Sequence, residues 1–253
     1  LGHMERWLIH EEYQHLAEIP FDGELPPEGL EYSPGLSRLC RSTFCPTDPG
    51  TLVLVDELFG ELLPHFTSGQ ASATLDEPFD LGRGRTRQLC EEKGWARVYF
   101  EYILEVCKII GKHGRSPRFW AWPVKAHPEW APELPPEAIA HAGYPSPATQ
   151  DRDYAKFVEA GVPFFVDTVG SGVLSVAGQT DTAIEGARTA AEGGVKHGAI
   201  GFENHDWGDD GHGHTPPVTF LSYAYGAAVG WAGQANQHMD IPLALDAHVF
   251  RDA

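Results

Sequence analysis

Hydrophobic residues along this 253-residue chain follow two alternating patterns, which together predict an α/β protein. Longer stretches place apolar residues at helical spacing, whereas short apolar runs are typical of buried strands. The expected strands cover residues 71–75, 118–124, 138–141, 162–168 and 199–204. The expected helices cover residues 3–17, 49–62, 87–111, 151–160, 180–196 and 218–231. Strands that alternate with helices in this way form parallel sheets.

The number of strands bears on how the sheet closes. A (β/α)8 TIM barrel has eight strands, and the pattern supplies five. The chain opens on LGHM, which is typical of the end of a strand, and stops within the apolar run IPLALDAHVF. We therefore expect residues 1–253 to form one partial TIM barrel, truncated at both ends and largely lacking strands 1 to 3. The alternative is an open doubly wound sheet, although the sequence contains no G-x-G-x-x-G motif.

The charge balance narrows the range of partners. The formal net charge is −18, from 18 basic and 36 acidic residues. This balance argues against nucleic acid or an anionic membrane as a partner, because both attract a basic surface. With no signal peptide and no apolar run of membrane-spanning length, a cytoplasmic location is expected. The sequence does not indicate an oligomeric state.

Candidate functional residues follow the ends of the predicted strands, where βα-barrel enzymes carry their chemistry. These positions hold His3, Asp76, Glu77, Trp120, Trp122, Tyr144, Asp167 and the stretch from Glu203 to His214. Carboxylates can act as acid and base on a glycosidic bond, and indole rings stack on the C–H face of a sugar. Trp7, Trp95 and Trp231 are expected in the core instead. The sequence therefore predicts a carbohydrate site.

The adjacent Asp76 and Glu77 are the candidate catalytic pair. Neighbouring residues on a strand point to opposite faces, but a turn at the strand end allows both to reach one pocket. One carboxyl can then donate a proton to the leaving oxygen while the other stays ionised and stabilises positive charge. The alternative is that this common dipeptide only caps the following loop.

The stretch HDWGDDGHGH at 205–214 raises the possibility of metal binding. A metal-dependent hydrolase could use His205, Asp206, Asp209 and His212. The spacing matches no standard zinc motif, however, and glycine-rich acidic loops also form turns. No metal site is therefore predicted.

Several stretches together resemble glycoside hydrolase family 20, the β-N-acetylhexosaminidases, and are closest to its bacterial branch. They are LGHMERWL at 1–8, PTDPGTL at 46–52, LDEPFDLGRGR at 75–85, RFWAWPVKAHPE at 118–129, GQTDTAIEGARTAAEGGVKHGAIGF at 178–202 and DWGDDGH at 206–212. They occur in the order of the family and cover most of the chain.

The resemblance implies a retaining mechanism in which the substrate's own acetamido oxygen attacks the anomeric carbon. Glu77 would be the general acid/base, and Asp76 would hold the acetamido N–H. The implied substrate-binding residues are His3, Trp120, Trp122, Tyr144, Asp206, Trp207 and Asp209. The expected partner is an N-acetylhexosaminide, and no metal or organic cofactor is implied.

The chain also departs from the family pattern at positions that would face the sugar. Ala121-Trp122 stands where the family usually has Gly-Asp, Val173 where it has Trp, and Gly213 where it has an aromatic residue. Each lost stacking platform could cost about 1 kcal/mol of binding. A non-catalytic carbohydrate-binding protein on the same barrel is therefore the alternative to an active glycosidase.

Overall fold

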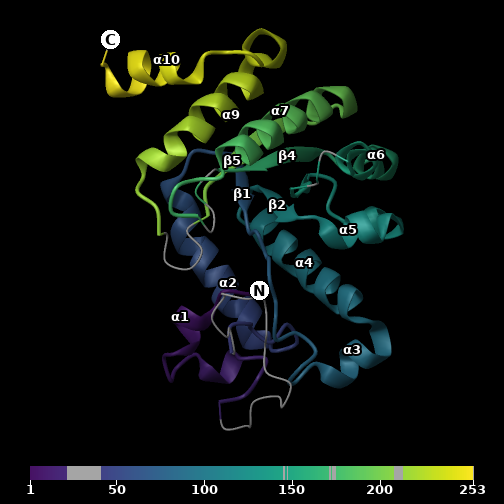
Figure 1. Cartoon of the computed structure of the whole chain (residues 1–253). Helices are drawn as coiled ribbons and strands as arrows, with labels where there is room; N and C mark the ends of the chain where they lie inside the picture. Colours follow the sequence, from purple (N-terminus) through teal and green to yellow (C-terminus); the bar gives the residue numbers. More distant parts are fainter. Residues whose placement is uncertain are drawn as a thin grey trace. The chain divides into compact units, whose positions relative to one another are not determined.

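The computed structural model describes residues 1–21, 41–144, 146, 148–170, 172, 175–207 and 213–252. The chain divides into two compact units, Leu1–Ile139 (unit 1) and Ala140–Ala253 (unit 2). Figure 1 labels their helices and strands. Each unit is described by itself.

Unit 1 contains a parallel strand pair with helices between and around the strands. Its helices are α1 (Glu5–Leu8), α2 (Pro49–Leu62), α3 (Arg87–Lys93), α4 (Trp95–Lys112) and α5 (Trp122–Ala126), and its strands are β1 (Gln70–Ser72) and β2 (Ser116–Trp120). Short 3-10 turns cover Gln14–Leu16, Leu63–His65 and Pro128–Glu133. Gln70 of β1 pairs with Ser116 of β2, and Ser72 pairs with Arg118.

The predicted helix at 49–62 is confirmed, and its start has a local cause. Asp48 is the N-cap, and its side chain accepts a hydrogen bond of 2.9 Å from the Gly50 N–H. Pro49 occupies the first helical turn, where its missing N–H costs nothing. The prediction at 3–17 is wrong in extent, because only α1 and the 3-10 turn at Gln14–Leu16 are helical there.

The predicted helix at 87–111 forms as two helices, α3 and α4. They meet at Gly94, whose φ of +85° is a left-handed conformation that interrupts the helix. Helix α4 packs against β2 and α2. Its buried face carries Val98, Tyr99, Tyr102, Ile103 and Val106. This face is the apolar core of unit 1 next to the strand pair.

Two predicted strands end earlier than expected, and both endings shape the candidate site. Strand β1 stops at Ser72 because Thr74 and Leu75 have φ values of +42° and +67°. A residue in a β-strand has a negative φ, so these two residues cannot continue the strand. Strand β2 stops at Trp120 because Pro123 lies in the first turn of α5. Trp122 therefore lies on a helix and not on a strand.

Unit 2 repeats strand and helix in order. Its strands are β3 (Ile139–His141), β4 (Phe164–Val169) and β5 (Gly201–His205), and its helices are α6 (Gln150–Ala160), α7 (Thr180–His197), α9 (Pro217–Asn236) and α10 (Ile241–Leu245), followed by a π-turn at Asp246–Phe250. The strands are parallel and neighbour one another in sequence order, with Ala140 opposite Phe164 and Val169 opposite His205. This order is typical of barrel-type winding.

Helix α7 covers β4 with a face of small residues. Figure 1 shows α7 and α9 side by side, and both contact β5. A Cβ on Gly194 would lie 3.0 Å from the Val166 side chain, so glycine allows this close approach. Ala187, Ala191, Tyr225, Val229, Ile241 and Leu245 form the adjoining apolar cluster.

The five predicted strands correspond to the five strands of the described residues, and the α/β fold class is confirmed. The parallel strands with intervening helices are consistent with part of a TIM-barrel-like fold. The expectation that Trp231 lies in the core is wrong, because 90% of its surface is exposed. It lies beside Ala232, whose φ of −149° interrupts α9 near the predicted helix end at residue 231.

Candidate functional site

Asp76 and Glu77 lie in a strained turn that follows β1, which we call the Asp-Glu turn (residues 74–77). Thr74, Leu75 and Glu77 have positive φ values, that of Glu77 being +44°. Each such conformation costs a residue with a side chain about 1–3 kcal/mol, and it persists only where the surroundings hold it. The backbone therefore leaves the line of the strand at this turn, and a pocket shared by the two carboxylates stays a prediction.

Three separate segments hold the Asp-Glu turn through backbone groups. The Trp120 N–H donates to the Thr74 carbonyl at 3.1 Å, and the Gly2 N–H donates to the Asp76 carbonyl at 3.2 Å. The Tyr99 hydroxyl donates to the Leu75 carbonyl. A Cβ on Gly2 would lie only 2.1 Å from the Glu77 carbonyl oxygen. The turn is thus fixed by β2, by α4 and by a glycine at position 2.

His3 lies against Glu77. Its Nε2 is 2.8 Å from Glu77 Oε2, and both side chains are partly exposed. The hydrogen bond to Glu77 raises the pKa of His3 above its usual 6.5, with a smaller contribution from the charge of Asp76, although desolvation opposes the rise. His3 therefore stays positively charged, and donates a hydrogen bond to Glu77, up to a higher pH than a free histidine would.

This contact leads to a prediction about His3. Because its pKa is raised in the folded protein, charged His3 contributes stability that is fully present below pH 6.5 and is lost as the pH rises through the raised value. Glu77→Gln removes the negative charge of the Glu77 carboxylate and should lower the pKa of His3 towards 6.5. An NMR titration of the His3 ring measures this shift. An unchanged pKa in the variant would show that Glu77 does not control His3.

A cavity of about 460 Å³ opens beside Glu77. It is lined by Glu77, Pro78, Phe79, Leu81, Arg83, Trp95 and Trp122. Trp122 stacks on Trp95 with ring centroids 5.1 Å apart, and on Tyr99 at the same separation. Trp95 also donates its indole N–H to the Leu81 carbonyl at 3.1 Å. We call this space the aromatic cavity; it offers one carboxylate and several flat apolar faces.

The two predicted sugar-binding tryptophans of unit 1 differ in exposure. Trp120, at the end of β2, exposes 7% of its surface, whereas Trp122 exposes 36%. Of these two, Trp122 lines the aromatic cavity, together with Trp95 on which it stacks. The role of Trp120 in binding stays a prediction.

Two buried carboxylates, which sequence reasoning missed, anchor the loop that follows Glu77. Asp80 accepts hydrogen bonds from the N–H groups of Ser42 and Thr43 at 2.7 and 3.0 Å. Glu18 accepts from the N–H and the hydroxyl of Thr86 at 2.9 and 2.6 Å. Burial raises the pKa of Asp80, although its backbone hydrogen bonds act in the opposite direction. Both ends of the loop are therefore fixed by polar contacts.

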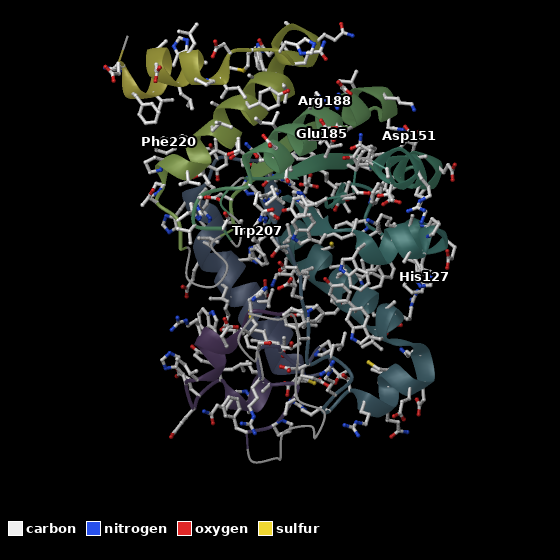
Figure 2. All side chains as sticks on the ribbon, viewed as in Figure 1. His127, Asp151, Glu185, Arg188, Trp207 and Phe220 are labelled. Atoms are coloured by element: carbon white, nitrogen blue, oxygen red, sulfur yellow. The ribbon has the colours of Figure 1, made fainter. Side chains whose placement is uncertain are left out.

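The remaining predicted residues lie in unit 2. Trp207, labelled in Figure 2, donates its indole N–H to the Tyr144 hydroxyl at 2.9 Å and stacks on His205 with centroids 5.5 Å apart. Asp206 Oδ2 lies 3.6 Å from Nε2 of the buried His214. Tyr144 and Trp207 are thus in contact, and the role of Tyr144, Asp206 and Trp207 in sugar binding stays a prediction. Asp209, and His212 of the alternative metal set, lie outside the described residues.

A second group of polar side chains lies at the carboxyl ends of β3, β4 and β5, and we call it the strand-end cluster. Its members are His141, Asp167, Glu203 and His205. Asp167 Oδ1 is 2.7 Å from His141 Nδ1 and 3.1 Å from His205 Nε2. Sequence reasoning included Asp167, Glu203 and His205 among the strand ends but missed His141. The signal was available, since His141 ends the predicted strand at 138–141.

The chain's fold resembles that of known glycosidases. The GH20 exo-β-N-acetylglucosaminidase from Vibrio harveyi, solved in complex with N-acetylglucosamine, matches 98% of this chain at 13% identity with a TM-score of 0.63. The chitobiase of Flavobacterium johnsoniae matches all of it at 14% identity and a TM-score of 0.53. The β-N-acetylhexosaminidase from Bacteroides fragilis matches 69% at 15% identity and a TM-score of 0.50. At these identities the likeness shows the fold alone.

The sequence comparisons match a different class of protein over a smaller part of this chain. No family model matches the chain. A type III pantothenate kinase of Gloeobacter violaceus is 31% identical over 118 residues, which is 38% of this chain. The chain spans about half the length of that kinase and about two fifths of the length of the glycosidases. The glycosidase likeness extends over far more of this chain than the kinase match does.

No helix in the described part of the chain is both long enough and apolar enough to cross a bilayer.

Proposed function

We propose that this chain belongs to a glycoside hydrolase that releases terminal N-acetylhexosamine with retention of configuration. The observation that carries the proposal is the His3–Glu77 contact on the strained Asp-Glu turn, beside the aromatic cavity. Perturbed titratable groups at a cavity are typical of catalytic sites. The fold likeness to GH20 enzymes, one of them solved with N-acetylglucosamine, supports the same class of substrate.

In the proposed first step, Glu77 acts as general acid. The acetamido oxygen of the substrate attacks the anomeric carbon, and the bond to the leaving oxygen breaks as that oxygen takes the Glu77 proton. Asp76 stays ionised, accepts the acetamido N–H and stabilises the positive charge of the oxazolinium ring. In the second step, water attacks the anomeric carbon, gives its proton to Glu77 and reopens the ring.

The neighbouring residues supply orientation. His3 donates a hydrogen bond to Glu77 and fixes its carboxyl group. Trp122 and Phe79 offer apolar faces to the sugar ring in the same cavity. The backbone contacts to Gly2 and Trp120 keep the turn from relaxing, so that the carboxylates are preorganised.

The test of the proposal uses the purified protein, with chitobiose and p-nitrophenyl N-acetylglucosaminide as substrates. We expect hydrolysis of both, with the β-anomer of N-acetylglucosamine as the first product seen by NMR. Absence of turnover on every hexosaminide would contradict an enzymatic role. Calorimetric binding of saccharides without turnover would favour the non-catalytic carbohydrate-binding alternative, which the departures at Ala121-Trp122 and Gly213 motivate.

Trp122→Ala tests the aromatic cavity. Loss of the indole face should weaken saccharide binding by about 5- to 10-fold, equivalent to about 1 kcal/mol or more. Trp130→Ala is the matched control, because Trp130 stacks on His127 and Phe100 of the same unit and is not among the residues that line the cavity. Calorimetry measures both variants. Equal affinities for the two variants would show that Trp122 is not part of the sugar site.

A further inference from the structure

The strand-end cluster brings together the donor atoms that a transition-metal ion requires. Its two imidazoles and two carboxylates come from three neighbouring parallel strands, and each side chain offers one ligand atom such that these four atoms lie within 4.8 Å of one another. Zinc in proteins takes four such nitrogen and oxygen ligands at about 2.0–2.2 Å. The ligands of a tetrahedral ion are therefore about 3.3–3.6 Å apart, so the cluster would draw together around a bound ion.

The printed separations within the cluster are short. Asp167 Oδ1 lies 2.7 Å from His141 Nδ1 and 3.1 Å from His205 Nε2. Glu203 Oε2 lies 3.9 Å from Nε2 of the same His141 ring, so the second carboxylate is next to these three residues.

Asp167 lies between the two imidazoles. Its Oδ1 is within hydrogen-bonding distance of His141 Nδ1 and of His205 Nε2, so an ion bound there would replace the protons that these atoms now share. Its Oδ2 accepts the Gly143 N–H at 3.1 Å, which holds the carboxylate in place.

The charge of the strand-end cluster also favours a bound cation. The Asp167 side chain has no exposed surface, His141 exposes 2%, and Glu203 adds a second carboxylate. One fully buried carboxylate and one partly exposed carboxylate lie side by side here, and negative charge is costly to remove from water. A divalent cation would balance that charge and would bind all four side chains at once.

We propose that the strand-end cluster binds a divalent transition-metal ion such as Zn²⁺. Two imidazole ligands favour Zn²⁺ or Co²⁺ over Mg²⁺ and Ca²⁺, which prefer oxygen ligands. The bound ion would also fix the His205 ring, on which Trp207 stacks, and so order the Tyr144–Trp207 pair. This ion site is independent of the acid–base chemistry proposed for Glu77.

The experiment is a calorimetric titration of the chelator-treated full chain with Zn²⁺, together with visible spectroscopy after Co²⁺ addition. We expect one equivalent of Zn²⁺ to bind, Co²⁺ to give the absorption bands of a nitrogen- and oxygen-ligated site, and excess Mg²⁺ not to compete. Glu203→Gln and His205→Gln should each weaken Zn²⁺ binding at least about tenfold. His197→Gln is the control, because His197 pairs with the exposed Asp151, labelled in Figure 2, and should bind Zn²⁺ like the unmodified chain.

Two outcomes would overturn the proposal. One is no binding of Zn²⁺ or Co²⁺ to the unmodified chain. The other is binding that both variants leave unchanged, which would assign the ion elsewhere. Where a variant does not fold, the ring resonances of His141 and His205 in the unmodified chain decide, because Zn²⁺ must shift both of them.

Discussion

Glu77→Gln should reduce hydrolysis of chitobiose by at least about 1000-fold while leaving the fold intact. The glutamine keeps the size of the side chain but carries no proton that it can transfer, and general acid catalysis contributes about 10²- to 10⁴-fold. The loss should be much smaller with p-nitrophenyl N-acetylglucosaminide, because p-nitrophenolate leaves without protonation. Steady-state kinetics on both substrates measures the difference.

The contrast between the two substrates separates a catalytic role from a structural one. Asp76→Asn should slow both substrates alike, since it acts on the acetamido group and not on the leaving oxygen. Glu92→Gln, on the exposed surface of α3 next to Gln88, is the matched control and should retain full activity. Equal losses on both substrates in Glu77→Gln would remove the general-acid assignment.

Gly2→Ala should impair both stability and activity, although Asp76 and Glu77 are unchanged. The new Cβ would lie 2.1 Å from the Glu77 carbonyl oxygen and 2.6 Å from that of Asp76, so the turn must move by about 1 Å. Overpacking of this kind costs about 1–3 kcal/mol. A displacement of about 1 Å at a catalytic group can lower the rate by about 100-fold.

Gly69→Ala provides the comparison for this substitution. Its Cβ would meet no other heavy atom within 4 Å, and it precedes the same strand β1. Thermal unfolding and kinetics of the two variants should therefore differ clearly. Wild-type stability and activity in Gly2→Ala would show that the turn adapts without cost, and that the strained conformation is not required.

Elements with strong local signals could be predicted from the sequence. The Asp48-Pro49 pair specifies the start of α2, and the apolar spacing of α4 specifies its buried face. The small residues of α7 and the apolar run of β4 lie within a residue or two of the expected bounds. In each case the residues that determine the element lie within it.

Features that depend on contacts distant in sequence could not be predicted. The left-handed conformations at Thr74 and Leu75 are held by Trp120 and Tyr99, and no residue type in the turn predicts these conformations. Asp80 resembles any loop aspartate until its distant partners Ser42 and Thr43 are known. Sequence reasoning placed Asp76 and Glu77 directly after a strand but could not show how the turn is held.

The site in unit 2 shows the same limit. Reading strand ends pointed to Asp167 and Glu203, but the grouping with His141 depends on the register of β3, β4 and β5. Trp231 followed the apolar pattern of α9 yet lies on the exposed side of the helix. Periodicity indicates which residues share a face but not what covers that face.

The link between Gly2 and the Asp-Glu turn has a consequence for motion. Residues 1–3 and 74–77 are far apart along the chain, but they share the Gly2–Asp76 hydrogen bond and the His3–Glu77 contact. Neither segment can leave its place without breaking these bonds, so their amide protons should exchange with deuterium at a common rate, as one cooperative unit. The start of the chain would then set how often the acid pair loses its alignment in the native ensemble.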